Sequence, residues 1–160
     1  MARLLRGQEI RKERLMNINL KKLDDRAIIP TYGTPFSAGA DLYSLPGEAV
    51  TVPAHGTVMI HTGLAIEIPE GYCGLIFARS GLASKRGLAP ANKVGVVDSD
   101  YRGEWMVALH NHTDAPAVVE GGERIAQMCI IPCVQASFDI VDELTDTQRG
   151  AGGFGSTGTK

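Results

Sequence analysis

The amino-acid sequence predicts an all-β domain that ends in a glycine-rich C-terminal arm. From Asn17 onwards, short apolar runs alternate with clusters of Gly, Pro, Asn or Asp, and this spacing is typical of a β-sandwich or a β-barrel. The chain of 160 residues contains 19 glycines and 8 prolines, and frequent turns between short strands would explain both counts. A chain of this length is expected to form one domain whose core needs no disulfide or metal.

The apolar runs that we expect to form strands differ in how clearly they alternate. Residues 64–68 alternate between apolar and other side chains until Pro69 ends the run, and residues 105–110 also alternate. The remaining expected strands are residues 50–52, 58–62, 72–78, 124–131 and 138–141. Residues 81–86 are the segment expected to add a helical turn.

Composition divides the chain into three segments. Residues 1–16 are polar and basic, so we expect a solvated N-terminal extension, either disordered or in a short helix. Residues 17–148 contain the strand pattern and form the expected β-rich domain. Residues 149–160 are rich in glycine and have no core pattern, so this arm is expected to be mobile without a ligand.

The charge is unevenly distributed, although the formal net charge is only -2. Residues 1–14 carry five basic and two acidic side chains, a local charge of 5 − 2 = +3, so the remainder carries -5. Because bulk charge gives no basic field, we expect no nucleic-acid partner. Such an acidic body would bind a polyphosphate only through a few aimed donors and a cation.

The cysteines and the lengths of the apolar runs indicate the cellular compartment of the protein. Cys73, Cys129 and Cys133 cannot all pair, none forms a C-x-x-C motif, and each lies in an apolar stretch. We therefore expect buried, reduced thiols. No apolar run approaches about 18 residues and no signal-peptide core follows the basic N-terminus, so we expect no membrane segment and a cytoplasmic protein.

Five short segments carry the candidates for chemistry. They are residues 38–42 with Asp41, residues 78–82 with Arg79, residues 95–104 with Asp98, residues 124–127 with Gln127, and the arm. Each also has an ordinary structural interpretation, such as a turn for Asp41 or a hairpin turn with a surface ion pair around Asp98. Those interpretations weaken because all five segments occur together in one short, β-rich chain.

Two further patterns point to no site. Residues 150–155 fit G-x-G-x-x-G, but a dinucleotide site needs a strand before this motif and a helix after it, and the chain ends five residues later. The same glycines still let backbone N–H groups approach a phosphate closely. His110 and His112 would face one side of a strand, and a surface or packing role is favoured because no third metal ligand is evident.

In this order, the five segments resemble the motifs of the trimeric dUTP pyrophosphatase (dUTPase) family. The matching stretches are AGADLYS, ARSGLA, GVVDSDYRGE, ERIAQ and RGAGGFGSTG, and the likeness covers the chain from about Asn17 to Lys160. The resemblance implies a jelly-roll-like β-barrel or sandwich in a homotrimer. It also implies active sites at subunit interfaces, with each C-terminal arm closing over a neighbouring subunit's site.

The resemblance implies hydrolysis of dUTP to dUMP and pyrophosphate, with these roles for the acidic and amide side chains. Asp98 would position the attacking water and take its proton, as a general base must do within hydrogen-bond reach. Asp41 and Asp100 would support the site by ordering arginines or metal-bound waters. Gln127 would contact the region of the α-phosphate.

The resemblance also assigns the residues that bind the triphosphate. Arg79, Ser80 and Gly81 would lie near the bridge between the α- and β-phosphates, where Ser80 can donate to the bridging oxygen. Arg149 would clamp the γ-phosphate with its guanidinium fork. The donors expected from the arm are Gly155, Ser156 and Thr157. Mg²⁺ would be held by phosphate oxygens and waters, without direct protein ligands.

Base and sugar are expected to meet a second group of residues. By resemblance, uracil would be read by a hairpin whose members are Asn92, Gly95, Val96 and Val97. Tyr101 would pack under the deoxyribose and leave no room for a 2′-hydroxyl, with Met106 lining the same pocket. Phe154 would stack on the uracil when the arm closes.

Three alternatives remain at this level. A dCTP deaminase would share the fold and release ammonia, but the complete Phe-containing tail and the third motif favour the pyrophosphatase. A non-catalytic nucleotide sensor would have no need of Asp98. A structural jelly roll of capsid type would leave the arm and the third motif unexplained.

Overall fold

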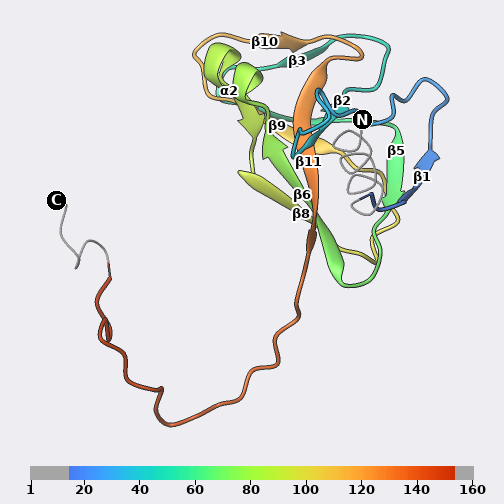
Figure 1. Ribbon diagram of the computed structural model, residues 1–160. Coiled ribbons are helices and arrows are strands. Elements are labelled where there is room, and N and C mark those ends of the chain that lie inside the picture. The colour runs from blue at the N-terminus through green and yellow to red at the C-terminus, as the bar shows by residue number, and fades with distance from the viewer. Residues whose placement is uncertain (1–14, 154–160) are drawn as a thin grey trace, which may run out of the picture.

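The structure, a computed structural model, describes residues 15–153, and its regular secondary structure is almost entirely β-strand (Figure 1). The strands are β1 (Asn19–Lys22), β2 (Ala40–Tyr43), β3 (Val50–Val52), β4 (Thr57–Ile60), β5 (Leu64–Glu67), β6 (Tyr72–Ala78), β7 (Leu88–Pro90), β8 (Val94–Val97), β9 (Val107–Asn111), β10 (Ala117–Val119) and β11 (Arg124–Pro132). One short helix, α2 (Ser80–Arg86), follows β6. No helix in the described residues is long and apolar enough to cross a bilayer.

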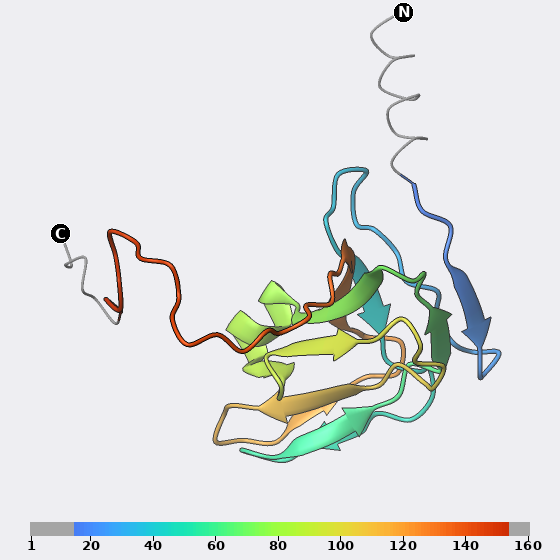
Figure 2. The ribbon, with the colours of Figure 1, turned by 90° about the horizontal axis from the view of Figure 1, so that it is seen from below.

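The strands form stacked layers around a single core (Figure 2). One sheet has the order β2-β11-β6-β8 and a second has the order β4-β9-β7, while β1 pairs with β5 and β10 pairs with β3. All of these pairings are antiparallel. The all-β prediction is therefore confirmed, and within residues 15–153 the ladders form separate sheets and no closed barrel.

The core forms because alternate side chains of each strand point to the same face. In β9, Val107, Leu109 and Asn111 are buried while the residues between them are partly exposed. Trp105, just before β9, is the largest fully buried side chain. Burial of such side chains contributes about 1.5–3 kcal/mol each.

Strand β6 pairs with a neighbouring strand on each of its two edges. On one edge it pairs with β11 from Tyr72 to Ala78, and on the other edge Gly74 pairs with Val97 of β8. Two hydrogen-bonded neighbours fix its register, because a slip by one residue would turn every side chain to the opposite face. The ends of β6 therefore fix the positions of the residues that follow it and lie beside it.

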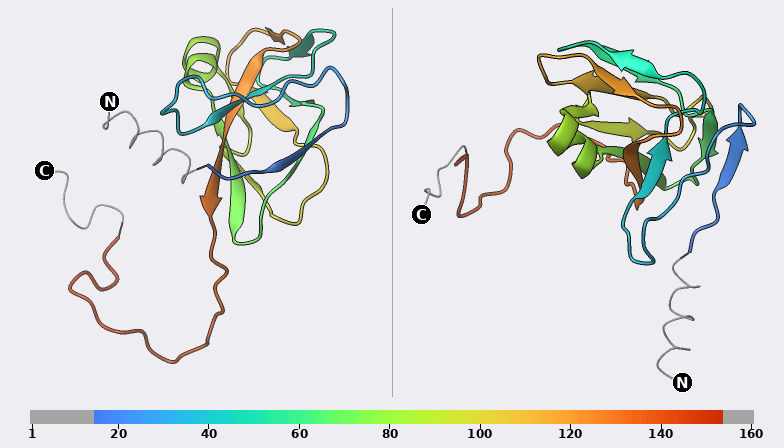
Figure 3. Two further views of the ribbon diagram at one scale, coloured as in Figure 1. Left: turned by 45° about the vertical axis from the view of Figure 1, so that its right-hand side comes forward. Right: turned by 90° about the horizontal axis from the view of Figure 1, so that it is seen from above.

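Most predicted strands are confirmed: residues 50–52 and 72–78 coincide with β3 and β6, and the boundaries of the others shift by at most two residues. The prediction of a strand at residues 138–141 was wrong: this stretch is extended and exposed, and no strand of the described chain lies beside it. A strand needs a hydrogen-bonded neighbour, and hydrophobicity alone does not supply one. Residues 133–153 instead run away from the domain (Figures 1 and 3).

Other sequence predictions have mixed outcomes. Residues 81–86 do lie in a helix, which also includes Ser80 and ends at Gly87 with a left-handed φ of 63°. The three cysteines are free, as predicted, but only Cys73 is buried, and Cys133 is exposed because it follows the last paired residue of β11. The prediction for residues 1–14 lies outside the described residues.

Gly74 allows strand β6 to approach Trp105. A Cβ atom at residue 74 would lie 2.5 Å from the Cη2 atom of Trp105 and 2.9 Å from the Cδ1 atom of Ile68. We predict that Gly74→Ala lowers the free energy of unfolding by about 1–3 kcal/mol, as overpacking does in cores. Urea denaturation would measure this, with Gly33→Ala as the control, because its Cβ would meet nothing closer than 3.7 Å. Equal stability of the two variants would contradict the prediction.

Candidate active site

A buried carboxylate, Asp41, organises the first group of candidate residues. It lies in β2, with 4% of its surface exposed. Its Oδ1 accepts hydrogen bonds from the Nε of Arg79 and the Nε2 of Gln127, both at 3.2 Å, and its Oδ2 accepts one from Arg124 at 3.3 Å. The three donors come from the end of β6 and from β11, so strand pairing brings them together.

The charge of this cluster suits an anion. One carboxylate and two guanidiniums give −1 + 2 = +1. Each guanidinium has five N–H donors and uses one of them on Asp41, which leaves others for a ligand. Ser80 is exposed next to Arg79, and Gly81 follows in the first turn of α2. A planar guanidinium fork of this kind is well matched to phosphate oxygens.

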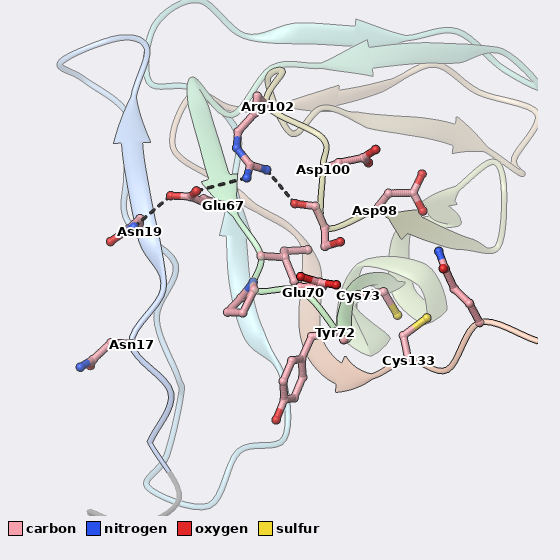
Figure 4. A pocket seen from close by; sticks show the side chains of 15 residues that line it. Asn17, Asn19, Glu67, Glu70, Tyr72, Cys73, Asp98, Asp100, Arg102 and Cys133 are labelled. Atoms are coloured by element: carbon pink, nitrogen blue, oxygen red, sulfur yellow. Dashed lines mark hydrogen bonds and ion pairs between the residues drawn. The ribbon is translucent and has the colours of Figure 1, made fainter.

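The second group surrounds Asp98, directly after β8. Asp98 and Asp100 are exposed and line an open cavity of about 1050 Å³ (Figure 4). In the described residues, the Asp98 carboxylate has no hydrogen-bond partner, so it is available to a water molecule. The charged residues of the cavity are Glu67, Glu70, Asp98, Asp100 and Arg102, a sum of −4 + 1 = −3. This cavity by itself would repel a triphosphate.

Residues 98–104 form a loop with several internal hydrogen bonds. The N–H of Tyr101 donates to the carbonyl of Asp98 at 3.2 Å, and the Tyr101 hydroxyl donates to the carbonyl of Glu104 at 3.0 Å. Arg102 donates to the carbonyl of Ser99 at 2.7 Å and to Glu67 at 3.1 Å (Figure 4). These bonds hold the ring of Tyr101 and the backbone of Asp98 in a defined position.

Glu104 ties this loop to the β4–β5 turn. Its carboxylate accepts hydrogen bonds from the backbone N–H groups of Thr62 and Gly63, at 3.1 and 2.7 Å, and contacts His61 Nδ1 at 2.9 Å. Burial raises the pKa of Glu104, but the hydrogen bonds from His61, Gly63 and Thr62 outweigh burial and hold the pKa below its ordinary value.

The residues expected to read the base lie along β8 and its approach. A Cβ atom at Gly95 would lie 3.3 Å from the Nδ2 of Asn92, so the glycine gives the amide of Asn92 room over the strand. Val96 is exposed and Val97 is partly buried. Met106, partly buried, precedes β9. The predicted hairpin members are therefore neighbours in the structure.

The two groups lie at opposite ends of strand β6. Gly74 pairs with Val97, so Asp98 lies beside Cys73 at the start of β6, whereas Arg79 follows its last residue. Six residues of strand separate positions 73 and 79, which corresponds to about 20 Å. One chain therefore does not bring Asp98 together with Arg79, Asp41 and Gln127.

The described part of the arm, residues 149–153, lies apart from both groups within one chain (Figure 1). Arg149 is exposed, and its Nε donates to the carbonyl of Gly152 at 2.8 Å. Residues 154–160 lie outside the described part of the chain, so the predicted roles of Phe154, Gly155, Ser156 and Thr157 stay predictions.

Sequence reasoning did not select Arg124 and Glu104 as site residues. Both occur inside the quoted motifs, but only the fold shows that Arg124 shares Asp41 with Arg79 and that Glu104 anchors a loop. The rings of His110 and His112 pack edge to face with centroids 4.5 Å apart. In the described residues there is no cluster of three side chains suited to a metal ion.

Comparison with known proteins identifies the family. The family profile described as dUTPase matches residues 25–158. A deoxyuridine 5'-triphosphate nucleotidohydrolase of Desulfitobacterium hafniense is 53% identical over 131 residues, 81% of this chain and 87% of that protein. A protein of the same name from Hahella chejuensis is 46% identical over 147 residues, 91% and 97% of the two chains.

Solved structures show the same fold. The dUTPase of Staphylococcus bacteriophage 80alpha, solved with dUPNHPP, has a TM-score of 0.82 and 29% identity, over 89% of this chain and 98% of that one. A mutant dUTPase from phage phi11 of S. aureus, described with a structural Mg(II) ion, has a TM-score of 0.71 and 25% identity, over 80% and 98%.

Fold and site define an all-β hydrolase whose candidate residues form two groups, one cationic and one acidic. The chain belongs to the dUTPase family. The family prediction made from the five motifs is confirmed.

The lowered pKa of Glu104 predicts how the free energy of unfolding changes at low pH. A carboxylate whose pKa is lower in the folded state contributes stability above its unfolded pKa, here 4.5, and loses it as the pH falls through the folded value. Between about pH 6 and about pH 3, the free energy of unfolding should therefore fall more in the wild type than in Glu104→Gln. Urea denaturation at a series of pH values measures this. The control is Glu48→Gln at an exposed position, and a Glu104→Gln profile parallel to that control would refute the assignment.

Proposed function

We propose that this protein hydrolyses dUTP to dUMP and pyrophosphate. The observation that carries the proposal is the exposed Asp98 carboxylate, which has no protein partner among the described residues and faces an open cavity at the end of β8. Family membership and the dUTP analogue bound to a structural relative support the same substrate. In a cell this reaction would supply dUMP for thymidylate synthesis and keep uracil out of DNA, and we place it in the cytoplasm.

In the proposed reaction, Asp98 accepts a hydrogen bond from a water molecule and orients it towards the α-phosphorus. The water oxygen forms a bond to that phosphorus, the bond from phosphorus to the oxygen bridging the β-phosphate breaks, and pyrophosphate leaves. Asp98 takes the proton of the water. A positioned base of this kind contributes about 10²–10⁴-fold to the rate. Asp100, exposed in the same cavity, supports this side of the site.

The phosphates are bound, in this proposal, by a second copy of the chain. Arg79, Ser80 and Gln127 would act on the same α-phosphate region as Asp98, yet the two groups lie about 20 Å apart along β6 in one chain. A subunit interface removes this conflict, because it places the cationic end of one chain against the acidic cavity of another. Arg124 adds a second guanidinium to the phosphate side. A homotrimer with cyclic symmetry would repeat this interface three times.

The exposed C-terminal segment supports an assembly of this kind. Beyond β11 the chain leaves the domain and exposes several large apolar side chains to water. Each is 87% or more exposed, and they are Val134, Phe138, Ile140 and Leu144. Such a segment gains stability by docking on another copy. We propose that it carries Arg149 to the γ-phosphate and Phe154 to the uracil of a neighbouring site. Gly155, Ser156 and Thr157 add donors there.

Base and sugar selection rests on the β8 hairpin and Tyr101. Asn92 and the backbone from Gly95 to Val97 would pair with uracil, and cytosine would leave their donors and acceptors unpaired. Met106 would line the same pocket as Tyr101. The bond from Tyr101 to the carbonyl of Glu104 holds the ring under the deoxyribose, where it leaves no room for a 2′-hydroxyl.

The exposed carboxylates of this site fit a Mg²⁺ ion that is held through its bound waters and the substrate phosphates. The described residues contain no cluster of three protein ligands, while the carboxylates Asp98 and Asp100 are exposed and free to accept hydrogen bonds from metal-bound waters. Mg²⁺ keeps several waters and binds substrate phosphates readily. When bound, it would supply positive charge that offsets the repulsion between the triphosphate and the acidic cavity.

We predict that the protein with Mg²⁺ releases pyrophosphate from dUTP and not from dCTP, dTTP or UTP. Asp98→Asn should lower turnover by about 10²–10⁴-fold while dUTP still binds. The control is Asp25→Asn, which removes an exposed carboxylate elsewhere and should leave turnover unchanged.

The same assay separates the alternatives. Ammonia released from dCTP would identify a deaminase instead. Bound dUTP without any product would identify a nucleotide sensor. Full activity in Asp98→Asn would remove Asp98 from the proposed mechanism.

A further inference from the structure

Two cysteines meet beside Asp98, although they are 60 positions apart in the sequence. Ile131 pairs with Cys73 across the β6–β11 ladder, and the N–H of Cys133 donates to the carbonyl of Gly71 at 2.8 Å. Both cysteines line the cavity that contains Asp98. Figure 4 shows their sulfur atoms next to each other. The proposed hydrolysis of dUTP uses neither thiol.

The ladder places the two side chains on one face of the sheet. Cys73 faces the same side as its partner Ile131, and Cys133, two residues further on, faces that side again. Diagonal neighbours of this kind have Cβ atoms up to about 7 Å apart, whereas a disulfide needs about 4 Å. Cys133 is the residue able to make up the difference, because β11 ends at Pro132 and the exposed segment beyond it has no strand partner among the described residues.

The two thiols differ in accessibility. Cys133 is exposed, whereas Cys73 is buried in β6. Burial raises the pKa of Cys73, and the neighbouring Cys133 and the charge of Asp98 raise it further. Since the thiolate is the reactive form, Cys133 is the thiol that meets an oxidant first, and Cys73 is placed to react second.

We propose that Cys73 and Cys133 form a reversible disulfide modification site that is closed by hydroperoxides. The Cys133 thiolate attacks one oxygen of the peroxide, the O–O bond breaks, and Cys133 becomes a sulfenic acid while the peroxide is reduced to water or an alcohol. The Cys73 sulfur then attacks the Cys133 sulfur, the S–O bond breaks, and water leaves. The two thiols are oxidised to one disulfide, and a dithiol reductant reverses the step.

A disulfide between Cys73 and Cys133 would restrain the C-terminal segment where it leaves the domain. Cys133 is where the chain leaves the domain, so the bridge ties the start of the exposed C-terminal segment to β6, opposite Asp98. This modification site does not depend on which nucleotide the protein hydrolyses.

Hydrogen peroxide tests the proposal on the folded, full-length protein. Peptide mapping by mass spectrometry without reduction should find Cys73 and Cys133 linked, with the loss of two free thiols per chain and of two hydrogen atoms in mass. Dithiothreitol should restore both thiols. A denaturing, non-reducing gel should show the linked chain as a monomer.

The third cysteine supplies a matched control. Cys129 is the other diagonal neighbour of Cys73 in the ladder, but its thiol contacts the carbonyl of Ala38 and does not line the cavity. Cys129→Ser should therefore form the bridge as the wild type does. Cys133→Ser should leave Cys73 free to alkylation after unfolding. Since Cys133 is exposed, this variant should fold normally, which circular dichroism checks, and Cys73→Ala provides the reciprocal test.

Three outcomes would overturn the inference. They are disulfides between the Cys133 residues of two chains, Cys133 oxidised to sulfinic acid while Cys73 remains free, and a Cys73 thiol that is lost equally in Cys133→Ser.

Discussion

Strand β6 is held in register by hydrogen bonds on both edges, and this constraint determines where the candidate residues lie. Its pairing with β8 places Asp98 beside Cys73, and its pairing with β11 places Arg79 near Asp41 and Gln127. The strand is seven residues long, and its two ends carry groups of opposite charge. A slip by one residue would place Trp105 against a side chain instead of Gly74, so packing and site geometry depend on the same register.

The cationic group depends on one buried acid. Asp41 has lost most of its hydration, and such a carboxylate is stable only when it is paired and hydrogen-bonded. Two arginines and one glutamine from different strands supply those bonds. Their fixed positions leave a net positive charge at the surface before any ligand arrives, and fixed donors need no rearrangement as charge develops on a phosphate.

The sequence was most informative where local patterns decide the structure. Alternation predicted β5 and β9, and the apolar run at residues 72–78 corresponds to β6. The strands β1, β2, β7, β8 and β10 were not anticipated, because runs of three or four residues seldom show a period. Residues 138–141 have the composition of a strand but no neighbour in the chain, and composition does not show whether a partner strand exists.

The candidate site followed a similar division. Motifs identified Asp41, Arg79 and Asp98 from the residues themselves. They did not show that Arg124 joins Asp41, that Glu104 anchors the loop of Tyr101, or that Cys73 meets Cys133. Arg124 and Asp41, Glu104 and its partners at residues 61–63, and Cys73 and Cys133 are all pairs of residues more than 35 positions apart in the sequence. Such pairs are set by strand register, which no local pattern records.

The proposed function requires one active site to take Asp98 and Arg79 from different chains. The direct measurement is activity in assemblies formed by co-expressing Asp98→Asn with Arg79→Ala, purified through a different tag on each chain. Each variant alone should be nearly inactive. If the sites are shared, mixed assemblies should regain activity, since in a cyclic trimer that contains both variants about one third of the sites combine the intact residue from each parent. Verified mixed assemblies without any regained activity would contradict the claim.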